Sequence, residues 1–168
     1  MSATLRAGIV LGLVIVVWTF VMGFTGWYKD PMLQTLFWAV ILFQIVILFW
    51  GLRLTAKEGK TYGGQIAAGL FMSLIGGAIA FVGSYVFTTM AFPEYFEEVR
   101  RAGEELFRAQ GMSEVDIQTR LDMMAATQTP FMQAFLGLIG TTITGVIVSL
   151  ILAIFLRKKS EPASTPQP

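Results

Sequence analysis

The chain has no cysteine and no histidine among its 168 residues. The first absence excludes disulfides and thiol nucleophiles, and the second removes the most common general base and metal ligand. No Ser, Asp or Glu arrangement resembles a nucleophile with its base, and the basic residues form no stripe that would bind nucleic acid. We therefore expect a protein that is not an enzyme, with no catalytic residues, no cofactor or metal site and no nucleic-acid partner.

Charge is scarce as well, because only 14% of the residues are charged, against roughly 25% in ordinary soluble domains. The 12 basic and 11 acidic residues all lie outside four uncharged runs, at residues 7–28, 31–52, 61–93 and 123–156. About 20 apolar residues cross a hydrocarbon core of roughly 30 Å, so each run is long enough to span a bilayer. The pattern predicts an all-α integral membrane four-helix bundle, with the lipid bilayer as its first partner.

The spans are expected at about residues 7–28, 31–52, 65–92 and 130–156, within a single transmembrane domain of residues 1–159. The first run is longer than the apolar part of a secretory signal, which has about 7–15 residues. It also lacks a small-residue cleavage site, so we interpret it as a retained membrane anchor. Residues 160–168 offer few apolar side chains to bury and are predicted to form a disordered cytoplasmic tail.

The distribution of Lys and Arg predicts the orientation, because these residues accumulate in short cytoplasmic loops. Four spans place both termini on one side. That side carries Arg6, Arg53, Lys57, Lys60, Arg157, Lys158 and Lys159, and the other side carries Lys29, Arg100, Arg101, Arg108 and Arg120. With the acidic residues included, the first side nets +5 and the second −4. We predict that both termini are cytoplasmic.

The connection between the third and fourth spans, at about residues 94–126, is predicted to form an extracytoplasmic amphipathic helical pair. Apolar residues recur every three or four positions from Phe92 to Phe107, with charged residues between them. Gly111 is expected to end this helix, and Ser113 is expected to cap a second one. The charged face supplies the candidate partner-binding residues, which are Glu94, Glu97, Glu98, Arg101 and Glu105.

Two interpretations of these carboxylates remain open. Glu94, Glu97 and Glu98 share one helical turn and could hold a divalent cation through their oxygen atoms. The spacing of four between Glu97 and Arg101, and between Arg101 and Glu105, instead favours a solvated face with ion pairs.

Small residues recur along the spans, where they allow helices to approach closely in lipid. The candidate helix-packing residues are Gly69, Ser73 and Gly76 in the third span and Gly137, Gly145 and Ser149 in the fourth. We expect the first, third and fourth spans to pack backbone to backbone, and the second to be the most exposed to lipid. Packing within one chain is the favoured interpretation, and a face for a homo-oligomer or a membrane-protein partner is the alternative.

No Asp, Glu, Lys or Arg lies within a span, which argues against a proton- or sodium-coupled transporter. The polar side chains within the spans are Gln44, Gln65, Ser84, Thr88, Thr89 and Gln133. Hydrogen bonds between helices are their favoured role. The alternative is that they line a passive path between protomers.

The order of these features resembles a family of small bacterial four-span proteins known as domain of unknown function 4199. The matching stretches are residues 62–69 at the start of the third span, Pro93-Glu94-Tyr95 before the charged connection, and residues 145–154 with 156–159 at the end of the fourth span. The resemblance implies a bacterial inner membrane and supplies no catalytic or binding residue.

The favoured function is a small non-enzymatic integral membrane protein, an interaction or accessory subunit that presents its acidic helical pair to a partner. The alternative is a passive transporter or channel subunit acting as an oligomer. A membrane enzyme acting on lipids or glycans through the outer carboxylates ranks third.

Overall fold

The computed structural model describes residues 1–156. The predicted disordered tail, at residues 160–168, and the basic residues Arg157, Lys158 and Lys159 lie outside the described residues. Four helical segments are long and apolar enough to cross a membrane: Ala3–Thr25, Leu33–Lys57, Tyr62–Ala91 and Pro130–Leu156. Because the described residues contain helices and no strand, the predicted all-α membrane bundle is confirmed.

The elements follow one another along the chain with short connections. They are α1 (Ala3–Thr25), the 3-10 turns η1 (Trp27–Lys29) and η2 (Leu33–Trp38), α2 (Ala39–Lys57), α3 (Tyr62–Val86), the π turn η3 (Phe87–Ala91), α4 (Tyr95–Ala109), α5 (Glu114–Ala125) and α6 (Pro130–Leu156). The second span therefore consists of η2 and α2, and the third of α3 and η3.

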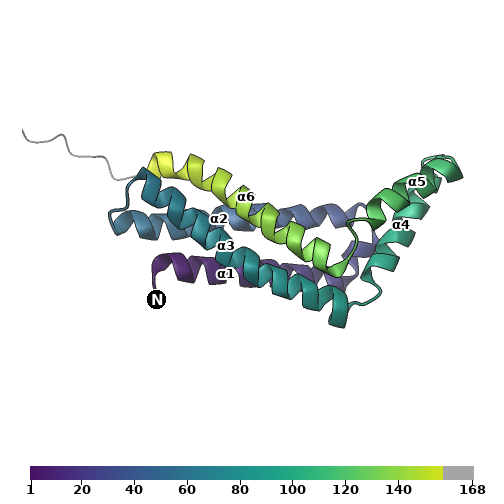
Figure 1. The fold of residues 1–168 in the computed structure, drawn as a ribbon, viewed down its shortest axis with the longest axis horizontal. Helices are drawn as coiled ribbons and strands as arrows, with labels where there is room; N and C mark the ends of the chain where they lie inside the picture. Colours follow the sequence, from purple (N-terminus) through teal and green to yellow (C-terminus); the bar gives the residue numbers. More distant parts are fainter. Residues whose placement is uncertain (157–168) are drawn as a thin grey trace, which may run out of the picture.

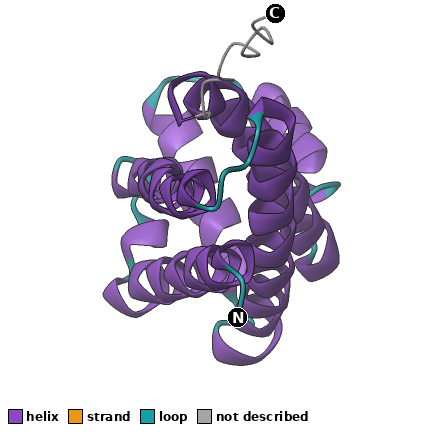
Figure 2. Ribbon diagram, turned by 90° about the vertical axis from the view of Figure 1, so that its left-hand side faces the viewer, coloured by secondary structure: helices purple, strands orange, loops and turns teal. Residues whose placement is uncertain are grey.

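The four spans lie lengthwise beside one another, and α4 with α5 forms a helical hairpin that extends from one end of the bundle (Figure 1). The start of α1 and the end of α6 lie at the opposite end (Figure 1). Viewed along the bundle, the spans surround a common axis (Figure 2). The bundle thus has a hairpin end, from which α4 and α5 extend, and a termini end opposite to it.

Each span packs on two main neighbours. α3 packs along α1 and α6, while α2 contacts α1 and α6 from the other side. The predicted packing of the first and fourth spans on the third is therefore observed, but α1 packs on α2 and α3 rather than on α6. The expectation that the second span is the most lipid-exposed is wrong, since an equal share of the second and fourth spans is buried.

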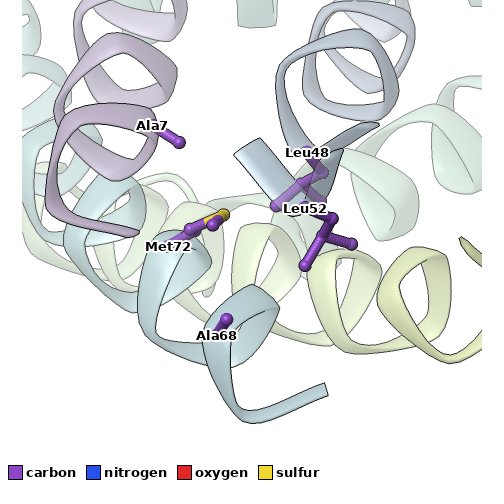
Figure 3. Packing of buried hydrophobic residues seen from close by; sticks show 5 residues of the cluster. All are labelled: Ala7, Leu48, Leu52, Ala68 and Met72. Carbon is purple, nitrogen blue, oxygen red and sulfur yellow. The ribbon is translucent and has the colours of Figure 1, made fainter. Parts of the chain in front are cut away.

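A buried apolar cluster joins α1, α2 and α3 near the termini end. Ala7, Leu48, Leu52, Ala68 and Met72 are each at most 2% exposed, and they converge between the three helices (Figure 3). A Cβ on Gly51 would lie 2.6 Å from the Cβ of Ala7, so this glycine lets α2 approach α1 closely.

The contact between α3 and α6 is reciprocal. A Cβ on Gly69 would lie 1.8 Å from the hydroxyl oxygen of Ser149, and one on Gly145 would lie 1.7 Å from the hydroxyl oxygen of Ser73. Each serine of one helix thus fits against a glycine of the other, because α3 and α6 run antiparallel (Figure 1). Gly76 lets α1 approach α3 closely in the same way, since a Cβ built on it would lie 2.8 Å from the Leu11 side chain.

Gly137 does not take part in this contact. It is exposed, and a Cβ built on it would have no atom within 4 Å. Of the six residues expected to pack helices together, Gly137 is therefore the exception within the described chain. The fourfold spacing placed it in line with Gly145, but at this level α6 turns the next residue toward α3, since a Cβ built on Gly77 would lie 2.7 Å from Leu138.

Buried amides connect the spans by hydrogen bonds. The Gln44 amide of α2 donates to the Thr141 carbonyl oxygen of α6 at 2.6 Å. The Gln65 amide of α3 lies 2.7 Å from the Thr55 hydroxyl of α2, which itself donates to the Leu52 carbonyl oxygen. The side chains of Gln44, Thr55 and Gln65 are at most 2% exposed, so their hydrogen bonds offset a large desolvation cost.

Candidate functional site at the hairpin end of the bundle

Glu98 of α4 attaches the hairpin to the end of α1. α1 ends at Gly26, whose left-handed φ of 71° turns the chain into η1. η1 presents Tyr28 and Lys29 toward α4. Glu98 accepts hydrogen bonds from the Tyr28 hydroxyl and from the Lys29 ammonium, the latter at 2.8 Å. We call this contact the latch.

The latch shifts the pKa of Glu98 and that of Tyr28 in opposite directions. The hydrogen bond from Lys29, followed by the one from Tyr28, lowers the pKa of Glu98 and keeps it a carboxylate. Burial, followed by the hydrogen bond to Glu98, raises the pKa of Tyr28 well above its ordinary value. The pair is thus a phenol donating to a carboxylate, which is a charge-assisted bond of the stronger kind.

An aromatic cluster lies beneath the latch. The Phe87 and Phe92 rings are 4.6 Å apart, and the Tyr28 and Tyr95 rings are 5.0 Å apart. The π turn η3 sets this arrangement, because the Phe92 N–H donates to the Phe87 carbonyl oxygen at 2.8 Å, one residue wider than an α-helical turn. A Cβ on Gly23 would lie 2.5 Å from Phe87, so the glycine lets the cluster pack directly on α1.

The hairpin has its own internal contacts. α4 ends in a Schellman turn, with Gly111 at a φ of 75° and the Met112 N–H donating to the Phe107 carbonyl oxygen at 3.2 Å. The Ser113 hydroxyl caps α5 by accepting from the Asp116 N–H at 3.2 Å. Gly111 and Ser113 therefore have the roles that the sequence predicted.

Arg108 holds the two helices of the hairpin together near the turn. It pairs with Glu104 of α4 at 2.7 Å and with Glu114 of α5 at 3.1 Å. Arg108 lowers the pKa of Glu114 through a hydrogen bond and through its charge.

The structure distributes the five candidate partner-binding residues between two roles. Glu97 and Arg101 form an exposed ion pair at 3.2 Å, and Glu94 and Glu105 are exposed beside them. Glu98 instead turns toward α1 and is used in the latch. Within residues 1–156, no three acidic residues are placed to hold a metal ion, so the cation interpretation gains no support there.

A cavity of about 320 Å³ lies at the base of the hairpin. Tyr28, Tyr95, Phe96 and Phe107 provide aromatic walls, and Gln34, Gln128 and Gln133 provide amides. Burial raises the pKa of Tyr95, with the Gln133 amide acting in the opposite direction. We call this space the mouth cavity.

The chain was compared with protein families, curated proteins and solved structures. Residues 6–158 match the model of a family described as protein of unknown function (DUF4199). The chain belongs to the DUF4199 family. No curated protein and no solved structure matches this DUF4199 chain. The resemblance inferred from the spans and the charged connection is therefore confirmed.

Several residues of the DUF4199 site are absent from the sequence-based prediction. Tyr28 and Lys29 meet Glu98 across about 70 positions of the chain, and no local pattern indicates that contact. Gly103 could have been found, because it lies within the apolar stripe of α4 yet has no side chain to pack. No sequence pattern distinguishes Gln34 or Gln128, and their amides become candidate site groups only because they line the cavity.

Proposed function

We propose that this protein is a non-enzymatic accessory subunit of the membrane, and that the hairpin of α4 and α5 recognises a partner protein. The observation that carries the proposal is the hairpin itself. It extends beyond the bundle (Figure 1), and most of its charged side chains, including Glu97, Arg101 and Glu105, are exposed instead of packing on the spans. A structural connection between two adjacent spans needs only a few residues, as the residues between α2 and α3 illustrate.

The charge of the hairpin favours a partner with a basic surface. Residues 94–122 contain eight carboxylates and four arginines, for a net charge of −4. Complementary charge raises the rate of encounter and excludes partners of like charge. Glu97, Arg101 and Glu105 lie on the exposed face, where such a partner would contact them.

We place both termini in the cytoplasm and the hairpin outside, in a bacterial inner membrane. The basic side chains Arg6, Arg53 and Lys57 near the termini end support this orientation. Reporter fusions after Arg6, Lys57, Glu105 and Lys159 test it. Only the Glu105 fusion should report an outside location, and any other result would reverse or invalidate the placement.

The passive transporter remains the second candidate from sequence, and the geometry gives it less support. Gln44 and Gln65 are used in hydrogen bonds between helices of one chain. Ser73 and Ser149 lie against glycines of the facing helix. These four polar side chains are buried between helices of one chain. They do not line the outer surface of the bundle, where a path between protomers would run.

Site-specific photocrosslinking tests the accessory role. A photoreactive amino acid at Glu97 or Glu105 should give a discrete protein adduct in native membranes, whereas one at Phe155, on the lipid-facing end of α6, should label lipid. The double variant Glu97→Lys/Glu105→Lys should lose partner capture, and the control Glu58→Lys, an exposed charge at the termini end, should retain it. If positions 97 and 105 label only lipid, the proposal is wrong. An adduct of two copies would identify the partner as the protein itself.

A further inference from the structure

The mouth cavity has the size and the lining of a small-molecule site. Its volume of about 320 Å³ falls within the range of ligand pockets, roughly 300–1,000 Å³. Its wall comes from separate parts of the chain, including Tyr28 of η1, Gln34 of η2, Phe96 of α4 and Gln133 of α6. The hairpin and the spans thus form the cavity together, and neither encloses it alone.

The polar groups of the cavity suit an uncharged ligand. Among the described residues that line it, none carries a charge. A charged ligand would therefore lose hydration without gaining a counter-ion, which is unfavourable. The Gln34 and Gln128 amides make no side-chain hydrogen bond to another residue in the range 1–156, so their donors and acceptors face the cavity or solvent. An amide can donate and accept, which fits a hydroxyl or ester group.

Gly103 is the second and independent observation. A glycine inside a water-exposed helix destabilises it relative to alanine. Gly103 has no left-handed φ, and a Cβ built on it would meet nothing within 4 Å, so neither backbone conformation nor close packing requires it. It lines the mouth cavity. Its effect on the structure is to leave space there.

The location of the cavity indicates which class of ligand would reach it. Tyr28 lies three residues after the first span, Gln34 lies in the first turn of the second and Gln133 lies in the first turn of α6. The cavity therefore lies beside the ends of the spans, where amphiphilic molecules of the membrane would reach it. We propose that the mouth cavity binds a neutral amphiphile, with its polar head at Gln34, Gln128 and Gln133 and its apolar part against the aromatic wall. This inference does not depend on the proposed accessory role.

Photolabelling of the purified full-length protein tests the inference. The probe is a monoacylglycerol with a diazirine in its acyl chain, and the matched probe is the free fatty acid with the same chain, which carries a negative charge. The monoacylglycerol should label residues 95–109 and 124–133, and it should raise the melting temperature. The fatty acid should label these segments less.

Two glycine variants provide the decisive comparison. Gly103→Phe fills the cavity, and Gly137→Phe adds the same ring at an exposed position of α6 that also has open space. Labelling of the two segments should fall about tenfold in Gly103→Phe, the change that 1.4 kcal/mol produces, and should not change in Gly137→Phe. If Gly103→Phe does not fold, Gln128→Leu/Gln133→Leu replaces it, with the same expected loss. Equal labelling of wild type and filled variant, labelling confined to lipid-facing parts of α2 and α6, or preference for the fatty acid would each overturn the inference.

Discussion

The reciprocal contact of α3 and α6 gives a sharp test of how the spans are held together. In Gly145→Ala, the new methyl carbon would lie 1.7 Å from the Ser73 hydroxyl oxygen and 2.5 Å from its Cβ. A rotamer change can move the oxygen, but the Cβ is fixed to the backbone. The helices must therefore separate. In Gly137→Ala on the same helix, the methyl group would meet nothing within 4 Å.

The comparison isolates the steric cost. Overpacking a close contact costs about 1–3 kcal/mol. Replacing glycine by alanine also favours the helix, by about 0.8–1.0 kcal/mol in water, but this gain is common to both variants. We therefore expect Gly145→Ala to be less stable than Gly137→Ala by about 1–3 kcal/mol. The free energy of unfolding can be measured by titrating detergent-solubilised protein with SDS and following helix content by circular dichroism.

A second substitution tests whether Ser73 is the cause. Ser73→Gly removes both clashing atoms, so the double variant Gly145→Ala/Ser73→Gly should recover most of the lost stability. The same Ser73→Gly change in Gly137→Ala should give no recovery. Equal stabilities for the two alanine variants, or no recovery in the double variant, would refute the close-contact explanation.

Three further predictions concern single contacts. Because Lys29 lowers the pKa of Glu98, the latch is complete above the ordinary carboxyl pKa of 4.5 and is lost as the pH falls through the lowered pKa of Glu98. Amide hydrogen exchange in α4 of the wild type should therefore rise as the pH falls through that lowered pKa. In Glu98→Gln, exchange in α4 should be fast at every pH. Unchanged exchange in wild type would contradict this role. Gly111→Ala should destabilise the hairpin by about 1–2 kcal/mol, because the φ of Gly111, 75°, is left-handed. Amide exchange should rise at the α4–α5 turn and not in the spans. A rise in both would indicate global unfolding instead. Gln44→Leu should lower stability to SDS by about 0.6–1.7 kcal/mol by removing the bond to Thr141, and an unchanged midpoint would show that the bond contributes nothing.

The spans could be predicted from sequence because the bilayer requires about 20 apolar residues of each of them. Their ends could not be read from charge alone. The second uncharged run stops at Leu52, whereas α2 continues to Lys57 and includes Arg53. Arg53 lies in the last turns of α2, and its guanidinium lies over the Phe49 ring at 5.6 Å, so an aromatic face covers part of the cation.

The candidate site was harder to predict because its contacts join distant parts of the chain. The amphipathic pattern identified α4 and its charged face, and the turn residues identified the hairpin. The pattern assigned Glu98 to the exposed charges, yet Glu98 lies at the edge of the apolar stripe and reaches Lys29 of η1. Only the fold brings these two residues together.

The two unpaired hydroxyls of the bundle have a physical explanation in the same close approach that places Gly69 and Gly145. Ser73 and Ser149 are fully buried, and neither hydroxyl oxygen has a hydrogen-bond partner among the described residues. Each oxygen lies within 1.8 Å of the position that a Cβ on the facing glycine would take, on the side where that glycine carries a Cα–H instead. Such contacts, at about 3.3–3.6 Å, recur at helix–helix interfaces and contribute about 0.5–1 kcal/mol each.

The bundle and the hairpin differ in how firmly they are held. The spans share close contacts at glycines and two buried amide sites, at Gln44 and Gln65, whereas the hairpin is attached through the latch and the aromatic cluster at its base. Its own turn and the Arg108 pairs hold α4 to α5 without the spans. Segments with few buried contacts open at lower free energy than the core, so the hairpin should open as a unit. Because the mouth cavity lies between the hairpin and the spans, such opening would change the cavity and the orientation of the charged face together. A ligand that binds only the closed cavity would therefore bias the surface offered to a partner, and the partner would change ligand affinity by the same factor.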